Sequence, residues 1–248
     1  MHIGTARAPS GALSSDLIRS PGPRVSRETI DRFLALEDLS GTVSDVLDKL
    51  GVRGAVGASI LQPSMTGARI VGPAVTVRNV PQEFQALKKS DAADNRMTEI
   101  EGINQGEAGD VLVIQGLRGT SNMGGIMASL AKRQGLAGAV VDGGVRDVGQ
   151  SRRIDFPIWS RDISPITGKW RCVTVEVNGT VNVAGVAVRP GDLVIADETG
   201  TCFVPHAIID KVLPLAEAVT YAERDWMRQI DEGVSLPEFA RMLYARGG

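Results

Sequence analysis

The chain has 248 residues, of which 43% are hydrophobic, and a formal net charge of −2. This length and apolar content suffice for one large domain with a proper core, and the small negative charge offers no basic field to hold nucleic acid. No apolar run approaches the ~20 residues that a membrane span needs. We therefore expect a cytoplasmic protein with neither a nucleic-acid nor a membrane partner.

The N-terminal part of the sequence predicts an arm followed by two helices. Residues 1–24 are rich in Gly, Pro and Ser and lack the apolar core of a signal peptide. We interpret them as a flexible arm or as a strap onto a neighbouring subunit. "SRETIDRFLALEDLS" has helical spacing, with Ser26 as N-cap. "TVSDVLDKLG" predicts a second short helix, capped by Thr42 or Ser44 and ended by Gly51.

The centre of the chain alternates between strand and helix patterns. "RIVGPAVTVRNV" predicts a Val-rich strand, and the polar stretch 82–105 predicts helix. Buried strands are then expected at "DVLVIQG", "AGAVVDG" and "FPIWS", with a helix over "GGIMASLAKRQG" between the first two. Strand, helix and strand at this spacing indicate a βαβ unit with parallel strands.

Beyond residue 160 the pattern changes to shorter strands and turns. "VTVEVNGTVNVAGVAV" alternates around Asn178-Gly179, which predicts a hairpin. "AGDVLVI" and "PGDLVIAD" are similar in sequence. We interpret them as two instances of the same turn leading into a strand. Charged helices are expected over 206–230. We predict a mixed α/β fold in which 25–235 form a single domain and 236–248 form a tail or helix.

Histidine and cysteine are too scarce to supply the common catalytic and metal sites. His2 and His206 are the only two histidines, so a His-rich metal site is excluded and a Ser-His-Asp triad would have to use His206. His206 follows "FVP" and is expected to open a helix. Cys172 and Cys202 lie in apolar stretches and are expected to be buried and reduced. Acid–base chemistry must then come from carboxylates, Lys, Tyr or metal-bound water.

Two glycine-rich loops follow consecutive predicted strands, and together they suggest a ligand site. Ligands in open α/β sheets bind at the carboxyl ends of parallel strands. The first loop leads into a helix that begins at Gly124-Gly125, where free N–H groups can hold a carboxylate or phosphate. The second loop carries Arg146, a planar fork for a carboxylate, and Asp147, a hard ligand for Mg²⁺. A plain tight turn and a solvated surface turn remain the alternatives for these two loops.

"GGIMASLAKRQGLAGAVVDGGVRD" resembles the RraA-like family, which includes the class II 4-hydroxy-4-methyl-2-oxoglutarate aldolases. "GVAVRPGDLVIADETGTCFVP", "TVSDVLDKLG" and "IVGPAVTV" also match the family, so that the resemblance covers about residues 40–235. It implies a β/β/α sandwich of the phosphohistidine-swivelling-domain type around the central βαβ unit, assembled as a homotrimer or hexamer.

The resemblance also implies a role for individual residues. Asp147 matches the family's ligand for Mg²⁺ or Mn²⁺, and Arg146 matches the residue that grips the pyruvyl moiety and stabilises its enolate. The backbone at Gly124, Gly125, Ile126 and Met127 matches the part of the family that receives the substrate carboxylate. Glu223 matches a C-terminal-helix glutamate that reaches the metal waters of a neighbouring subunit. The implied activity is cleavage of a C–C bond in a 2-oxo acid, by retro-aldol reaction or by oxaloacetate decarboxylation, to release pyruvate.

One position departs from the family pattern. Active aldolases of the family commonly have an acid where this chain has Gly125, and that acid holds a catalytic water. Either another residue takes this role here, or decarboxylation, which demands less proton transfer, is the preferred reaction. Two other functions are kept as alternatives: a non-catalytic regulator that acts by protein binding, and a class I aldolase that uses Lys132 as a Schiff base.

Overall fold

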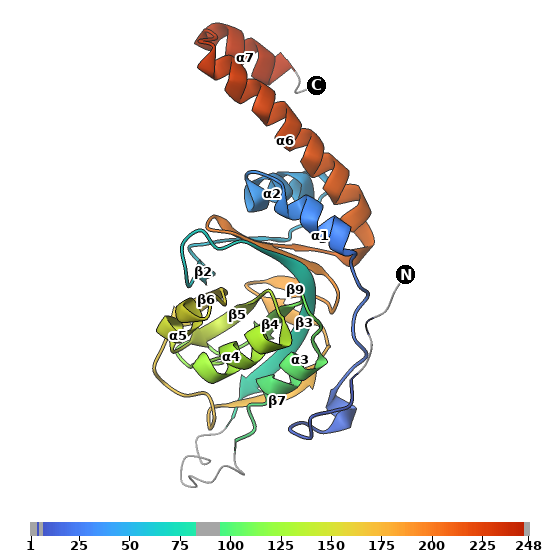
Figure 1. Cartoon of the computed structure of the whole chain (residues 1–248), viewed down its shortest axis with the longest axis vertical. Coiled ribbons are helices and arrows are strands. Elements are labelled where there is room, and N and C mark those ends of the chain that lie inside the picture. The colour runs from blue at the N-terminus through green and yellow to red at the C-terminus, as the bar shows by residue number, and fades with distance from the viewer. Residues whose placement is uncertain (1–3, 5–6, 83–94, 246–248) are drawn as a thin grey trace.

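The computed structural model describes residues 4, 7–82 and 95–245, and Figure 1 shows how their helices and strands are arranged. The N-terminal part contains η1 (Ser15–Leu17), α1 (Arg27–Leu34), α2 (Leu39–Lys49), β1 (Ala55–Gly57), β2 (Gln62–Pro63) and β3 (Ile70–Pro81). The centre contains α3 (Glu99–Gln105), β4 (Val111–Gln115), α4 (Gly125–Gln134), β5 (Gly138–Val145), α5 (Val148–Arg153) and β6 (Ile158–Ile163). The C-terminal part contains β7 (Cys172–Val177), β8 (Val181–Val183), β9 (Val186–Val188), β10 (Leu193–Ala196), β11 (Gly200–Val204), η4 (His206–Ile208), α6 (Ile209–Asp231) and α7 (Leu236–Ala245).

The long strand β3 belongs to two sheet regions at once. Its first residues pair with β10 in an antiparallel manner, and from Ala74 onward it pairs in parallel with β4. The strands follow the order β1-β11-β10-β3-β4-β5-β6-β2, with β7 added to the far end of β3. Strands β3, β4, β5 and β6 are parallel, so the predicted βαβ unit is confirmed as β4-α4-β5 and is repeated as β5-α5-β6.

Three apolar clusters divide the molecule into layers. One cluster lies between the two sheet regions, where Phe203 and Val194 meet Val113, Val140 and Trp159. A second packs β4 and β5 against α3 and α4, and a third packs α1, α2 and α6 against β10 and β11. Figure 1 shows these helices on opposite sides of the strands, with the C-terminal half of α6 and α7 projecting away. The predicted mixed α/β sandwich is therefore confirmed.

Three local predictions need correction. Asn178-Gly179 does not close a hairpin, because β7 pairs with β3 while β8 pairs with β9. Asn178 has φ 56°, whereas Gly179 does not have the positive φ that a type I′ turn needs, and the Asn178 amide bonds to Thr76 of β3 instead. Helix α2 begins at Leu39, earlier than its predicted caps, so Thr42 and Ser44 lie inside the helix, where Thr42 is buried. Within 82–105, the described helix is only the short α3, and 83–94 lie outside the described residues.

Other local features agree with the sequence. Ser26 caps α1 by accepting the Thr29 amide at 3.1 Å. The repeated "GD" turns are closed in the same way: Asp110 accepts the Glu107 amide and Asp192 accepts the Arg189 amide, each at 2.8 Å. In the described parts of the chain, no helix has the length and apolarity that crossing a membrane would require.

The segment before α1 is anchored to the domain by a buried ion pair. Arg24 donates from Nη1 to Asp110 Oδ2 at 2.8 Å, and its Nη2 lies 2.6 Å from Oδ1. Asp110 is completely buried, and burial raises the pKa of its carboxyl in spite of the Arg24 guanidinium. Removing Arg24 would leave a buried carboxylate without its countercharge.

We expect Arg24→Ala to lower the free energy of unfolding by about 3–5 kcal/mol, because the buried Asp110 carboxylate would lose its countercharge. Arg27→Ala is the matched control, since Arg27 pairs with Asp31 on the exposed surface of α1; it should cost only about 0.3–0.5 kcal/mol. Denaturant unfolding of both variants measures the difference. Equal losses in the two variants would contradict the buried ion pair as an anchor.

Candidate functional site

The loop after β4 runs along the end of β5 and joins it by backbone hydrogen bonds. The Asn122 amide donates to the Gly144 carbonyl at 2.7 Å, and the Arg146 amide donates to the Met123 carbonyl at 3.1 Å. These bonds bring the start of α4 next to Arg146 and Asp147. The two glycine-rich loops therefore meet at one edge of the parallel sheet, as the sequence predicted from their order.

The buried side chain of Asn122 fixes the shape of the first loop. Its Nδ2 donates to the carbonyls of Leu117 and Thr120, and its Oδ1 accepts the Leu117 amide at 3.1 Å. Cys172 Sγ lies 3.6 Å from the same oxygen. Since these groups come from the loop and from β7, Asn122 holds the loop rigidly against the sheet.

Helix α4 presents free amides to this edge of the sheet. Its N-cap is Gly124, which has no side chain to accept the first amides of the helix. The Gly125 amide donates to Asp147 Oδ2 at 3.1 Å. The amides of Ile126 and Met127 belong to the first turn, where no intrahelical acceptor exists. They are available to a carboxylate, and the helix dipole favours negative charge there.

Arg146 and Asp147 lie close against the helix start, where residue 124 has no side chain. A Cβ atom on Gly124 would lie 3.1 Å from both Arg146 Nε and Asp147 Oδ2. Arg146 Nε and Asp147 Oδ2 are 3.7 Å apart, and both side chains are partly exposed. Asp147 has φ 56°, a left-handed conformation that is uncommon outside glycine and that Asp and Asn tolerate better than most residues.

A cavity of about 290 Å³ joins these groups. Its wall contains every site residue that the sequence predicted on the two loops: Gly124, Gly125, Ile126, Met127, Arg146 and Asp147. Glu99 and Lys169 also line it, together with Ser121 and Thr167. A neighbouring cavity of about 670 Å³ shares Gly125, Ile126 and Asp147 and extends between α4 and α5 to Arg133 and Arg153.

The sequence analysis missed Glu99, the first residue of α3. This residue is 5% exposed, and burial raises its pKa to about 7, although Lys169 and Arg146 favour the charged form. The local sequence showed only a polar helical stretch, so nothing distinguished this acid from Glu101 two residues later. A buried acid at the start of a helix near the sheet edge is visible only in the tertiary structure.

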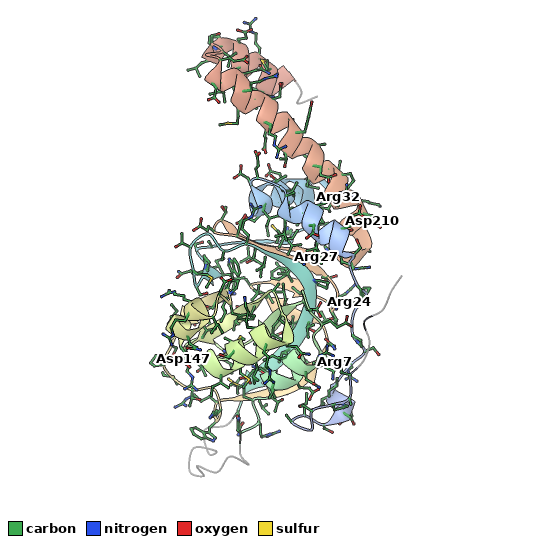
Figure 2. The ribbon with its side chains drawn as sticks, viewed as in Figure 1. Arg7, Arg24, Arg27, Arg32, Asp147 and Asp210 are labelled. Atoms are coloured by element: carbon green, nitrogen blue, oxygen red, sulfur yellow. The ribbon has the colours of Figure 1, made fainter. Side chains whose placement is uncertain are left out.

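Glu223 does not line either cavity. It lies on α6, where partial burial and the nearby Asp38, Asp45 and Glu37 raise its pKa. Helix α6 packs against α1 and α2, and Figure 2 labels Asp147 beside α4 and α5, on the other side of the sheet. Within one chain the structure therefore separates Glu223 from the remaining predicted site residues.

Asp147 fits a divalent cation that keeps most of its water. Its Oδ1 has no hydrogen-bond partner among the described residues and its side chain is 53% exposed. No group of three His, Cys, Asp or Glu side chains that could hold a metal occurs in residues 7–82 and 95–245. Mg²⁺ commonly binds through only one or two carboxylates, so one open carboxylate beside a carboxylate-binding helix end agrees with such a site.

The residues of the alternative chemistries lie elsewhere in the described structure. Lys132 Nζ donates to the Asp155 carbonyl at 2.6 Å on the surface and does not line either cavity. His206 lies at η4, where its amide bonds to Asp192. Both cysteines are buried and free, as predicted, and burial raises the pKa of each thiol to about 12.

The sequence of this chain is similar to those of several known proteins. The chain is 28% identical over 238 residues to protein DlpA of Legionella pneumophila, covering 94% of this chain and 37% of DlpA, so it spans well under half of that relative. It is also 28% identical over 213 residues to a "putative 4-hydroxy-4-methyl-2-oxoglutarate aldolase" of Halalkalibacterium halodurans, covering 85% of this chain and 93% of the relative.

A solved structure with a similar fold is RraAS2 of Streptomyces coelicolor, described as an unusual member of the RNase ES inhibitor RraA protein family. Its TM-score is 0.68 at 26% identity, over 86% of this chain and all of that one. The family model described as RraA-like, Aldolase/RraA, matches residues 40–203, which contain both loops of the site. On this match, the chain belongs to the RraA-like family.

Proposed function

We propose that this protein is a divalent-metal-dependent C–C lyase that releases pyruvate from a small 2-oxo acid. The observation that carries the proposal is the cavity in which the free amides of α4, the Arg146 fork and the Asp147 carboxylate converge. A regulator that acts only by protein binding has no need for this convergence. The aldolase name of the H. halodurans relative supports the same proposal.

Each group in the cavity has a distinct task in this chemistry. The amides of Ile126 and Met127 receive the substrate carboxylate at the positive end of α4. Arg146 binds the oxygen on which charge develops when the C3–C4 bond breaks and the enolate forms. Asp147 would hold Mg²⁺ or Mn²⁺, which would supply Lewis-acid polarisation of the 2-oxo acid. The direct test is a pyruvate-release screen over 4-hydroxy-2-oxo acids and oxaloacetate, with and without each metal.

We expect activity to require Mg²⁺ or Mn²⁺. Asp147→Asn should remove most of the activity, and the activity that remains should no longer depend on the metal. Asparagine tolerates the left-handed backbone but removes the carboxylate charge that would hold the cation. Asp155→Asn is the matched control, since Asp155 also has a positive φ and lies at the surface. Mn²⁺ binding by electron paramagnetic resonance provides a readout that does not depend on turnover. Full activity of the Asp147 variant in EDTA would reject the metal site.

Arg146→Lys should fold normally and lose activity by about 10²–10³, the usual cost of losing one preorganised transition-state donor. Lysine keeps the charge but cannot reproduce the planar two-point grip. Arg118→Lys is the control, because Arg118 is an exposed arginine whose nearest acid is Asp162 at 3.8 Å. Steady-state kinetics should show the loss mainly in kcat/KM. If the Arg146→Lys variant kept wild-type turnover, Arg146 would have only a structural role in its turn.

We further propose that the protein is a homotrimer or hexamer in which Glu223 serves the site of a neighbouring subunit. Its distance from the cavity of its own chain motivates this proposal. The projecting helices also expose Tyr221 (78%), Leu236 (83%) and Tyr244 (78%), which a partner could cover.

Co-expression of Asp147→Asn and Glu223→Gln chains tests this assembly. Each variant alone should be inactive, whereas mixed oligomers should recover activity, because some sites then combine an intact Asp147 with an intact Glu223 from another chain. Glu232→Gln, an exposed position at the end of α6, is the control and should leave activity unchanged. A fully active monomer in light scattering, or the absence of recovery, would contradict the shared site.

A further inference from the structure

Glu99 is an acid in the cavity to which neither the family pattern nor the predicted site assigns a role. It begins α3 and lines the cavity together with Arg146, Asp147 and the first turn of α4. Glu99 is only 5% exposed, so this lining residue is largely shielded from bulk solvent. The Glu99 carboxyl therefore belongs to the cavity in which the C–C bond of the substrate would break.

The groups around Glu99 leave it able to take up and release a proton near neutral pH. Lys169, from the segment between β6 and β7, and Arg146, after β5, face it with positive charge. Cys172 of β7 lies close enough for Glu99 to raise the pKa of its thiol, and Asp147 lines the same cavity. Burial outweighs the two cations and raises the pKa of Glu99 to about 7.

A side chain at position 125 would press closely on its neighbours. A Cβ atom there would lie 3.0 Å from Gln150 Cγ and 3.1 Å from Asp147 Cβ. Glycine itself has no side chain, so position 125 cannot supply the base that retro-aldol cleavage needs. Another element of the cavity wall can supply the proton acceptor, and among the described lining residues Glu99 is the carboxyl that remains once Asp147 is assigned to the cation.

We propose that Glu99 is the catalytic acid–base residue for retro-aldol cleavage, an inference that rests on the proposed lyase function. The Glu99 carboxylate takes the proton of the C4 hydroxyl as the C3–C4 bond breaks. C4 becomes the carbonyl carbon of one product, and the electron pair of the broken bond forms the pyruvate enolate. Glu99 then gives the same proton to C3 of the enolate, which yields pyruvate and restores the carboxylate.

Decarboxylation of oxaloacetate makes a smaller demand on this residue. The leaving carboxylate is already ionised and departs as CO₂, so no hydroxyl proton has to be removed. Water can protonate C3 of the resulting enolate. The two reactions therefore share Arg146 and Asp147 but differ in their need for Glu99.

The test compares Glu99→Gln with Glu101→Gln. Both substitutions lie on α3 and remove a buried carboxylate, but Glu101 bonds to Ser10, Asn104 and Gln105 and does not line the cavity. We expect Glu99→Gln to lower kcat for cleavage of 4-hydroxy-4-methyl-2-oxoglutarate by about 10²–10⁴ with a smaller change in KM. Its rate of oxaloacetate decarboxylation should change by less than about tenfold.

The pH profile separates a proton-transfer role from a structural one. The wild-type kcat/KM for aldol cleavage should rise as pH increases through about 7, because Glu99 must be ionised to accept the proton. This limb should persist in Glu101→Gln and disappear in Glu99→Gln. Equal losses in both reactions, or an unchanged pH limb in Glu99→Gln, would overturn the inference. If the wild type releases pyruvate from neither substrate, the lyase function itself fails instead.

Discussion

The backbone pairing between residues 121–123 and 144–146 is the constraint on which the site depends. It lays the loop after β4 along the end of β5, so that the first turn of α4 and the Arg146-Asp147 pair become neighbours. The Asn122 side chain makes this arrangement stable, because it satisfies backbone groups of the loop that would otherwise be buried without partners. Without this internal support, the helix amides and the Arg146 guanidinium would not be held in a fixed relative position.

The two glycines at the start of α4 are as important to this site as its charged residues. At Gly124 a Cβ would contact Arg146 and Asp147, and at Gly125 it would contact Asp147 and Gln150. Their absence lets an anion approach the helix end and lets Asp147 accept the Gly125 amide. Glycine at 125 also supplies no acid, so the chain combines an open anion pocket with the need for a proton acceptor from elsewhere.

Helix α3 shows how environment gives two acids different behaviour. Burial alone would raise the pKa of Glu101, but hydrogen bonds from Ser10, Asn104 and Gln105 outweigh it and lower that pKa. Among the described residues, no side chain donates a hydrogen bond to Glu99, and burial raises its pKa to about 7. A carboxyl that is well satisfied stays ionised and structural, whereas one that is poorly satisfied beside two cations is suited to proton transfer.

The sequence by itself determined the parallel βαβ unit, the helix start at Gly124-Gly125 and the place of Arg146 and Asp147, because these depend on local periodicity and on the order of strands in a parallel sheet. It also carried the family resemblance that the family model matches over residues 40–203. Only the tertiary structure decided that β7 joins β3 instead of closing a hairpin at Asn178-Gly179, since strand partners are chosen by long-range packing. The same holds for Glu99 and Glu223. Neighbours far along the chain bury one acid in the cavity and keep the other away from it, and no local pattern records such contacts.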